Sequence, residues 1–321
     1  MGKAAKSTAA SDKVQVDVDG RHLTLSNLTK VLYPEAGFAK GEVLDYYSRI
    51  APVLLPHLAD RPLTVKRYPN GVDGKFFFEK NASKSTPAWV RTVNLPAPGS
   101  TKNRETIDYI VVEGLPALVF LANLAALELH VPQWRVPRTS GKGTGKPRTD
   151  LIVFDLDPGP PATIVECCEV AVLLREVLEQ DGLSAIAKTS GSKGMQVSAP
   201  VEVADQEYPS RYAHAVARRL ESQRPDLIVS RMSKSLRPNK IFVDWSQNNP
   251  AKTTVAPYSL RARPYPTVST PLTWGEVESG EHLSFSAGDV LDRVGEFGDL
   301  FAGVLDDANR APITKAMTQA E

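Results

Sequence analysis

Two aspartates, Asp155 and Asp157, lie two positions apart at the end of the apolar run 151–154. On a strand, this spacing places both side chains on one face, about 7 Å apart along the backbone. Carboxylates this close repel each other and raise one pKa unless a cation neutralises them, and hard divalent ions with oxygen ligands are the usual partner. A chance strand-end acid followed by a turn residue before Pro158 fits the same pattern, and for so short a motif that simpler interpretation is the more frequent one.

A third acid, Asp244, follows the apolar run 241–243. It favours a metal site over the chance interpretation. An ionised side chain at the end of a buried strand needs a partner to be tolerated. Three strand-borne carboxylates suit a site for two divalent ions that performs phosphoryl transfer, one ion activating the attacking oxygen and the other the leaving group. The sequence therefore predicts Asp155, Asp157 and Asp244 as catalytic metal ligands.

The segment 189–194, TSGSKG, follows a predicted strand and has the composition of a phosphate-binding loop. It offers hydroxyls, the Lys193 ammonium and two glycines that permit close approach of the backbone to an anion. A plain Gly/Ser turn with a solvated lysine is the alternative, and it is the slightly favoured one if the segment is taken alone.

Three other patterns suggest a known type of site but lack a residue or a spacing that the site requires. The segment 141–146 is not a Walker A loop, because Ser140 stands where the first glycine is required and Pro147 follows the lysine. Residues 72–74 resemble a ligase adenylation motif, but Gly71 occupies the position of the nucleophilic lysine. The five histidines lack paired metal-ligand spacing, so by spacing alone each is a packing or surface residue.

Composition describes a folded globular protein, with 42% hydrophobic and 23% charged residues among 321. The net charge is only +1, but basic residues form two acid-free runs, at 135–148 and 231–240. Cys167 and Cys168 are too few for a disulfide framework or a structural zinc site and are interpreted as packing residues. Without a run of about 18 apolar residues or the apolar core of a signal peptide, we expect a cytoplasmic, nucleoid-associated protein with no membrane contact.

The elements that must position these residues are predicted from periodicity and capping signals and indicate an α/β fold. We expect a disordered tail at 1–13, one domain at 14–300 made of two packed lobes (about 14–145 and 146–300), and a partly disordered tail at 301–321. Helices are predicted at 41–58, 115–129, 163–180 and 209–222. Strands are predicted at 62–68, 75–79, 151–154, 185–189, 227–231 and 240–245.

Seven motifs, in order along the chain, resemble the polymerase domain of the bacterial multifunctional DNA ligase D, a member of the archaeo-eukaryotic primase superfamily. They are NLTKVLYP at 27–34, RYPNG at 67–71, FFFEK at 76–80, HVPQW at 130–134, DLDP at 155–158, TSGSKG at 189–194 and FVDWSQN at 242–248. The resemblance extends over roughly residues 20–295. It implies a primase-type catalytic core, with an RRM-like palm packed on an N-terminal α/β lobe.

The same resemblance implies a set of site residues. Asp155, Asp157 and Asp244 would hold two ions, Mn²⁺ by preference or Mg²⁺. The incoming nucleotide would be bound by Lys66, Phe78, His130, Ser190, Lys193, Arg237, Gln247 and Arg261. A DNA 5′-phosphate would be bound by Asn27, Lys30 and Lys40, for which solvated lysines beside a helix start are the alternative, and Phe77 would stack on a template base.

One position departs from the family pattern. After Lys193 and Gly194 the family has a hydrophobic residue followed by histidine, whereas this chain has Met195 and Gln196. Glutamine forms hydrogen bonds but carries no proton or charge to a phosphate. We therefore expect a change in triphosphate affinity or in priming efficiency.

The implied function is a template-directed polymerase-primase that adds nucleotides, ribonucleotides by preference, at short gaps or ends of 5′-phosphorylated DNA during repair. The ligase and phosphoesterase modules of the full multifunctional protein are not in this sequence, so a stand-alone primase-polymerase is expected, with a Ku-like end-binding protein and a separate ligase as partners. There are two alternatives. One is a catalytically silent module that binds DNA ends and recruits repair factors, which the basic runs and the Met195–Gln196 departure suggest. The other is a two-metal nuclease that would use the same carboxylates.

Overall fold

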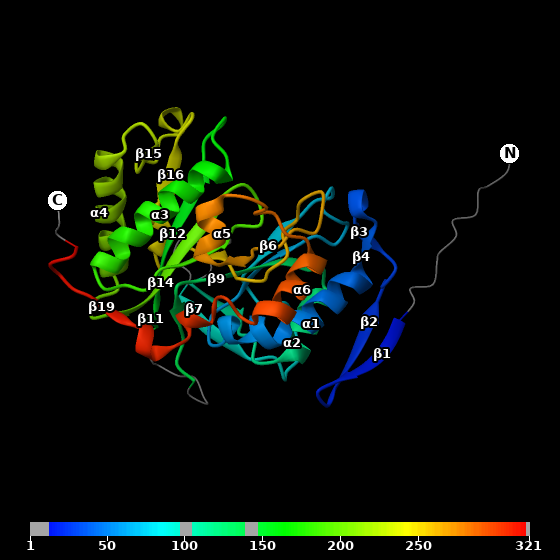
Figure 1. Ribbon diagram of the computed structural model, residues 1–321. Coiled ribbons are helices and arrows are strands. Elements are labelled where there is room, and N and C mark those ends of the chain that lie inside the picture. The colour runs from blue at the N-terminus through cyan, green and yellow to red at the C-terminus, as the bar shows by residue number, and fades with distance from the viewer. Residues whose placement is uncertain (1–12, 97–104, 139–146, 319–321) are drawn as a thin grey trace.

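The computed structural model describes residues 13–96, 105–138 and 147–318, which form two α/β halves side by side (Figure 1). The larger sheet has the strand order β15-β16-β12-β14-β13-β18, with β19 added in parallel beside β14. Its strands are β12 (Leu151–Pro158), β13 (Ile186–Thr189), β14 (Met195–Val203), β15 (Ile228–Val229), β16 (Ile241–Asp244), β18 (Pro271–Leu272) and β19 (Ala311–Ile313).

The smaller sheet has the order β17-β9-β5-β6. It consists of β5 (Thr64–Arg67), β6 (Phe77–Glu79), β9 (Ala126–Val131) and β17 (Thr254–Val255). Because β17 follows β16 in the sequence, the chain returns to the smaller sheet before it adds β18 and β19 to the larger one. Separate two-stranded pairs are β1 (Lys13–Val18) with β2 (Arg21–Ser26), β3 (Val31–Tyr33) with β4 (Phe38–Ala39), β7 (Thr92–Pro96) with β8 (Thr106–Ile110), and β10 (Trp134–Arg135) with β11 (Arg148–Thr149).

Helices cover both sheets. In Figure 1, α3 (Ile164–Gln180) and α4 (Tyr208–Gln223) flank the larger sheet, and α1 (Lys40–Leu58) and α2 (Leu115–Asn123) accompany the smaller one. The short α5 (Trp274–Ser279) packs on α3, and α6 (Ala287–Phe297) packs on α1. In the described parts of the chain, none of the helices has the length and apolar character needed to cross a bilayer.

Local signals predicted several elements correctly. The helix after Thr163 begins as expected, because the Thr163 hydroxyl accepts from the Val165 amide at 3.2 Å and Glu166 accepts from the Thr163 amide at 2.7 Å. The strands predicted at 62–68 and 75–79 pair antiparallel as β5 and β6. Cys167 and Cys168 are buried and free, which agrees with a packing role.

The helix predicted at 115–129 is wrong beyond Asn123. Helix α2 ends there, Ala125 takes a left-handed conformation (φ +57°), and the chain continues as β9 between β5 and β17. A continuous Leu/Ala run is compatible with either a buried helix or a buried strand, so its periodicity does not decide between them. Pairing with two neighbouring strands, which the local sequence does not reveal, gives the strand.

The C-terminal tail is ordered over most of its length. Phe301 is buried, and β19 pairs with β14 so that Ala311 is the partner of Val201. Within the tail expected to be partly disordered, residues 301–318 thus include packed and paired segments, and residues 319–321 lie outside the described part of the chain. At the other end Lys13 begins β1, and residues 1–12 lie outside the described part of the chain.

Candidate functional site

The three predicted carboxylates lie together at the end of two neighbouring strands. Strands β12 and β16 pair antiparallel with Asp155 directly opposite Asp244, and Asp157 follows two residues later on the same face of β12. The opposite face of β12, with Phe154 and Leu156, is fully buried. The alternation of β12 therefore fixes one face in the core and leaves the other to the carboxylates.

Two of the carboxylates are held by hydrogen bonds. Gln196, the partner of Asp155 on β14, donates its side-chain amide to Asp155 Oδ1 at 3.0 Å. Asp244 accepts the Ser246 amide on Oδ1 at 3.0 Å and the Gln247 side-chain amide on Oδ2 at 2.8 Å. The residue that departs from the family pattern thus contacts a carboxylate, and Gln247, expected at the nucleotide, contacts Asp244.

Electrostatic strain is concentrated on this face. Burial, reinforced by the negative charge of Asp157, raises the pKa of Asp155 to about 7, and the hydrogen bond from Gln196 opposes the rise. Burial and repulsion from Asp244 also raise the pKa of Asp157, against the attraction of Arg237. Carboxylates that destabilise one another in this way are stabilised by a cation between them.

An oxygen-only donor set fits a hard divalent ion such as Mn²⁺ or Mg²⁺. Within the described ranges, no three Asp, Glu, His or Cys side chains converge on a single ion position. Rotation of the Asp244 carboxylate toward an ion would compete with the three hydrogen bonds that it accepts, from the Ser246 amide, the Ser246 hydroxyl and the Gln247 side-chain amide.

The loop at 189–194 is a tight turn between β13 and β14. Ser190 donates its amide to the Gly194 carbonyl at 2.9 Å, and its hydroxyl oxygen accepts the amides of Ser192 and Gly194, each at 3.3 Å. These amides are already satisfied, so they do not form a free phosphate cradle. What the loop presents outward is the exposed side chain of Lys193.

Both glycines of this loop are required by close packing. A Cβ on Gly191, where φ is +66°, would lie 2.6 Å from the carbonyl carbon of Val268. A Cβ on Gly194 would lie 2.1 Å from the Leu156 carbonyl oxygen. Gly194 therefore allows the loop to lie directly against β12, next to the carboxylates, and Gly191 allows it to lie against the backbone at 268–269.

A second cluster lies on one face of the smaller sheet. Lys66 on β5 is the partner of Phe78 on β6 and of Glu128 on β9. His130, two residues after Glu128, donates through Nε2 to Glu128 Oε2 at 2.9 Å, and Arg261 Nε lies 3.5 Å from Glu128 Oε1. The structure thus brings together four of the residues expected at the nucleotide: Lys66, Phe78, His130 and Arg261.

Consecutive phenylalanines of the FFFEK motif contact different basic residues. The Lys66 ammonium lies 4.1 Å from the centre of the Phe76 ring and 5.7 Å from that of Phe78. The Phe77 ring instead lies 5.1 Å from the Arg67 guanidinium. Phe77 and Phe78 are about half exposed, so their rings are accessible for stacking.

The two clusters are linked through Lys188 and Arg261. Lys188 is buried and donates to the Val255 carbonyl at 3.0 Å and to the Ser269 hydroxyl at 2.7 Å. Burial lowers its pKa to about 7, with Asp155 opposing the shift and Arg261 adding to it. The pKa of Lys188 is therefore affected by a charge in each cluster, Asp155 among the carboxylates and Arg261 beside Glu128.

Arg237 reaches the site from the basic run 231–240. Its guanidinium carbon lies 3.7 Å from the centre of the Phe242 ring and its NH2 donates to the Met232 carbonyl at 2.9 Å. A Cβ on Gly159 would lie 1.9 Å from the Arg237 carbonyl oxygen. This close contact holds the basic segment against the end of β12, beside Asp157.

The predicted 5′-phosphate residues also come together, in the first lobe. Lys40 donates to the Ser26 carbonyl at 2.6 Å, and Lys30 donates to the Pro69 carbonyl at 2.5 Å. Burial, followed by repulsion from Lys30, lowers the pKa of Lys40 to about 8. Asn27, whose carbonyl accepts the Lys30 amide at 3.0 Å, has a left-handed backbone (φ +54°) that turns the chain from β2 toward β3.

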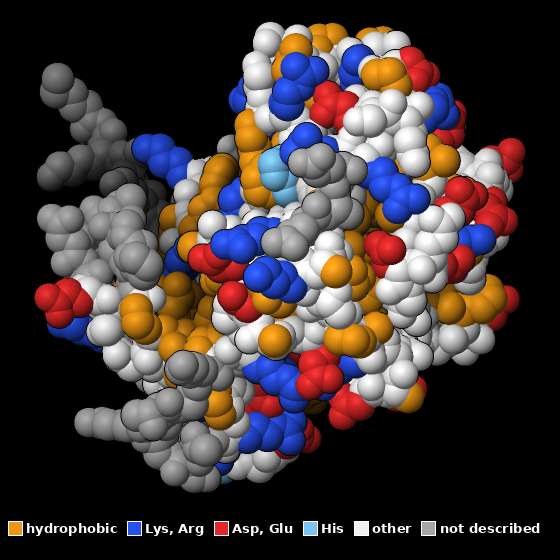
Figure 2. All heavy atoms as spheres, turned by 90° about the vertical axis from the view of Figure 1, so that its left-hand side faces the viewer, with side chains coloured by type: hydrophobic (Ala, Val, Ile, Leu, Met, Phe, Trp, Pro, Cys, Tyr) orange, Lys and Arg blue, Asp and Glu red, His pale blue; other side chains and the backbone are white. Residues whose placement is uncertain are grey.

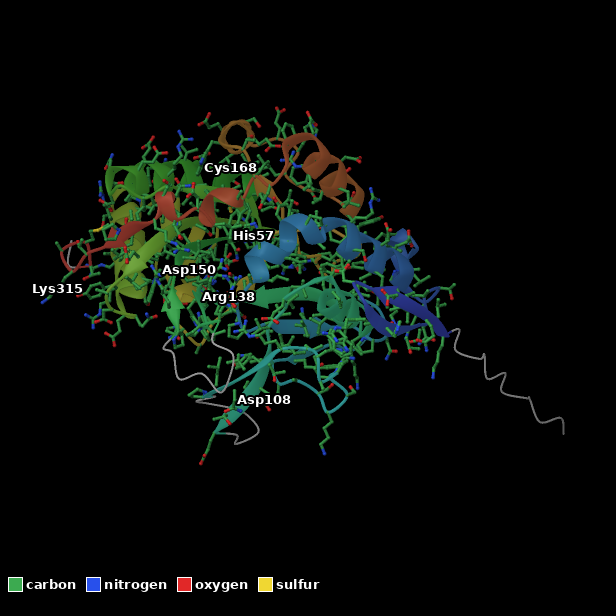
Figure 3. All side chains as sticks on the ribbon, turned by 90° about the horizontal axis from the view of Figure 1, so that it is seen from below. His57, Asp108, Arg138, Asp150, Cys168 and Lys315 are labelled. Carbon is green, nitrogen blue, oxygen red and sulfur yellow. The ribbon has the colours of Figure 1, made fainter. Side chains whose placement is uncertain are left out.

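A large cleft of about 1600 Å³ lies beside β6. Its walls are the β7–β8 hairpin, which projects from the body of the molecule and includes Asp108 (Figure 3), and the segment 249–253. Residues of its lining that suit a nucleic-acid strand are aromatic, amide or basic: Arg67, Phe77, Phe78, Lys80, Asn81, Lys84, Asn94, Trp134 and Asn249.

Glu128 was missed by the sequence prediction. A Glu-x-His pattern on a strand would have placed Glu128 and His130 on the same face. The signal was hidden because residues 115–129 were predicted to be helical, where a spacing of two separates side chains.

The chain is similar in sequence and in fold to known proteins. A family model described as the LigD primase-polymerase domain matches residues 39–301. The chain is 44% identical over 297 residues to the multifunctional non-homologous end joining protein LigD of Mycolicibacterium smegmatis, which covers 92% of this chain and 37% of that protein. It is 28% identical over 300 residues to the bifunctional non-homologous end joining protein LigD of Bacillus subtilis, covering 92% of this chain and 46% of that protein.

The fold matches a solved structure described as the polymerase domain from Mycobacterium tuberculosis ligase D in complex with DNA. The TM-score is 0.83 at 42% sequence identity, and the match covers 89% of this chain and 98% of that chain. The mixed α/β fold expected from the sequence is thus confirmed. The chain spans less than half the length of either LigD protein named above.

Proposed function

The chain belongs to the LigD primase-polymerase domain family, and from this premise we propose that it is a template-directed nucleotidyltransferase that adds nucleotides at ends or short gaps of DNA during end-joining repair. The observation that supports this most is the register of β12 and β16, which sets Asp155 opposite Asp244 with Asp157 on the same face. The charge that these carboxylates concentrate suits two-metal phosphoryl transfer.

Each residue group has a part in this reaction. Asp155, Asp157 and Asp244 would hold two ions, Mn²⁺ or Mg²⁺, which when bound supply the charge that activates the attacking oxygen and stabilises the leaving group. The charges of Lys66, Lys193, Arg237 and Arg261 would neutralise the triphosphate, and His130 and Ser190 would help to orient it by hydrogen bonds. Exposed Phe78 would stack on the incoming base and Phe77 on the template, which is compatible with every base because each has a π-face.

DNA would be bound by local sites rather than by a uniformly basic surface. Figure 2 shows one face of the molecule on which Lys and Arg side chains are interspersed with Asp and Glu. The buried Lys40 beside Lys30 supports capture of a 5′-phosphate, and the cleft beside β6 supports passage of a strand. The match to a polymerase domain in complex with DNA supports the same partner.

Primer extension on a gapped, 5′-phosphorylated duplex tests the function directly. Reactions contain Mn²⁺ or Mg²⁺ and either ribonucleotides or deoxyribonucleotides, which also measures the sugar preference. We expect templated addition by wild type, loss of addition in Asp155→Ala/Asp157→Ala, and unchanged addition in Asp292→Ala, an exposed acid on α6. Binding of the gapped duplex by the double variant is expected to persist.

Three outcomes would contradict the proposal. Extension by Asp155→Ala/Asp157→Ala would show that the reaction does not need these two carboxylates. Binding to 5′-phosphorylated gaps without addition under either metal would favour the silent recruitment module. Shortening of labelled DNA without added nucleotide would favour the nuclease. A Ku-like end-binding protein and a ligase, on this chain or separate, are the partners that sealing the product would require.

A further inference from the structure

We propose that Glu128 is a positioning residue that fixes the geometry of the basic side chains around the nucleotide; this inference deepens the proposed function and rests on it. The Glu128 side chain is only 4% exposed, so it does not present a surface to a nucleotide. It lies in β9, between Lys66 on β5 and the segment that contains Arg261. It therefore acts through its neighbours.

Both oxygens of the Glu128 carboxylate are engaged. Oε2 lies 2.9 Å from His130 Nε2. Oε1 accepts the Ala262 amide at 3.0 Å and lies 3.5 Å from Arg261 Nε and 3.9 Å from Lys66 Nζ. Three basic side chains from different segments thus converge on one carboxylate, whose pKa falls to about 2 because the hydrogen bond from His130 and the charge of Arg261 outweigh burial.

The carboxylate orders these bases without cancelling their charge. Lys66 and Arg261 contribute two positive charges against the one negative charge of Glu128, and protonation of His130 would add a third. The excess positive charge suits a polyanionic ligand at the open side of the cluster. Without Glu128, the two fixed cations would repel each other and move apart.

Glu128 also links this cluster to the loop at 189–194. Its bond to the Ala262 amide holds the backbone next to Arg261, and Arg261 NH1 in turn donates to the Ser190 carbonyl. Among the described residues, buried Arg261 Nε has no hydrogen-bond partner, so the guanidinium is held by its NH1 bond to Ser190 and by the attraction of Glu128. A change at Glu128 should therefore reach Ser190 through Arg261.

Glu128→Gln is the test, because it keeps the shape of the side chain and removes the charge. We expect KM for the nucleotide in primer extension to rise about tenfold while kcat changes by less than about threefold. We expect the dissociation constant for ATP with Mn²⁺, measured calorimetrically, to rise in parallel. Glu128→Asp, which keeps the charge, should show a smaller rise.

Glu276→Gln is a matched control. Glu276 also accepts from an arginine, Arg293, at 2.6 and 2.9 Å and from a backbone amide, but at the start of α5, outside the nucleotide cluster. It should lower Tm and leave KM unchanged. A double-mutant cycle adds a second control: in an Arg261→Met background, Glu128→Gln should raise KM less than it does in wild type.

The inference is overturned if Glu128→Gln lowers Tm but leaves KM and the ATP dissociation constant unchanged, or if its effect is fully additive with Arg261→Met. If Glu128→Gln does not fold, an unchanged KM in Glu128→Asp overturns it equally. Absence of extension by wild type would instead contradict the proposed function, and the calorimetric comparison with ATP would still decide the role of Glu128.

Discussion

Asp155 on β12 lies directly opposite Asp244 on β16, although 89 positions separate them in the sequence numbering (244 − 155). The antiparallel register sets both carboxylates on the face that carries Asp157, and the opposite face is sealed in the core. Burial of the apolar face of β12 stabilises the fold and therefore keeps the like charges close together despite their repulsion. A cation would relieve that repulsion. The same relationship predicts how the protein responds to metal.

Asp155→Asn should stabilise the metal-free protein and remove its response to Mn²⁺. The substitution removes one of the mutually repelling charges and retains a group that can meet Gln196. In chelator, we expect Tm to rise by about 1–2 °C, equivalent to roughly 1 kcal/mol for a chain of this size. Adding Mn²⁺ should raise Tm in wild type and not in the variant, as measured by calorimetry. An equal Mn²⁺ response in both proteins would exclude Asp155 as a ligand.

Lys40→Met should weaken the preference for a 5′-phosphorylated gap. Methionine preserves most of the buried stem and removes the ammonium, so we expect about a tenfold loss of affinity for the phosphorylated duplex. Affinity for the same duplex without the phosphate should not change. Fluorescence anisotropy measures both, and the exposed Lys315→Met is the control. Equal losses on both duplexes would indicate a general electrostatic contribution instead.

His57 should make stability fall with acidification. Its Nε2 lies 2.8 Å from Asp299 Oδ2 in a buried site, and burial lowers the pKa of His57 below its ordinary 6.5. Between the lowered pKa and 6.5 the unfolded state binds more protons than the folded state, so stability increases as pH rises to about 6.5. His57→Gln should flatten the dependence of Tm on pH just below 6.5. An unchanged slope would show that other groups, such as Asp299 at lower pH, cause it.

Gly194→Ala should destabilise the protein and weaken nucleotide binding. The added methyl would lie 2.1 Å from the Leu156 carbonyl oxygen, so the loop must move away from β12. We expect a loss of about 2–3 kcal/mol in urea unfolding. Gly295→Ala, in α6 with nothing within 4 Å of its added Cβ, should instead stabilise by about 0.5–1 kcal/mol. Equal stability of Gly194→Ala and wild type would contradict the packing described for the loop.

The sequence by itself determined those features of the protein that depend on short local patterns. Alternation along 151–157 assigned Asp155 and Asp157 to one face, the capping box at Thr163 marked the start of α3, and glycine and proline limited the turns. The motifs in their order also indicated the family, and through it a set of candidate nucleotide-binding residues. These features depend on a few consecutive side chains, which is why the chain reveals them before it is folded.

Only the tertiary structure decided which distant segments meet. The run 115–129 is compatible with a helix, but pairing of β9 with β5 and β17 makes its second part a strand and thereby exposes Glu128 to Lys66, His130 and Arg261. Pairing of β19 with β14 likewise orders a segment whose composition suggested a tail. Strand pairing is a long-range interaction whose free energy depends on partners far along the chain, so local periodicity does not contain it.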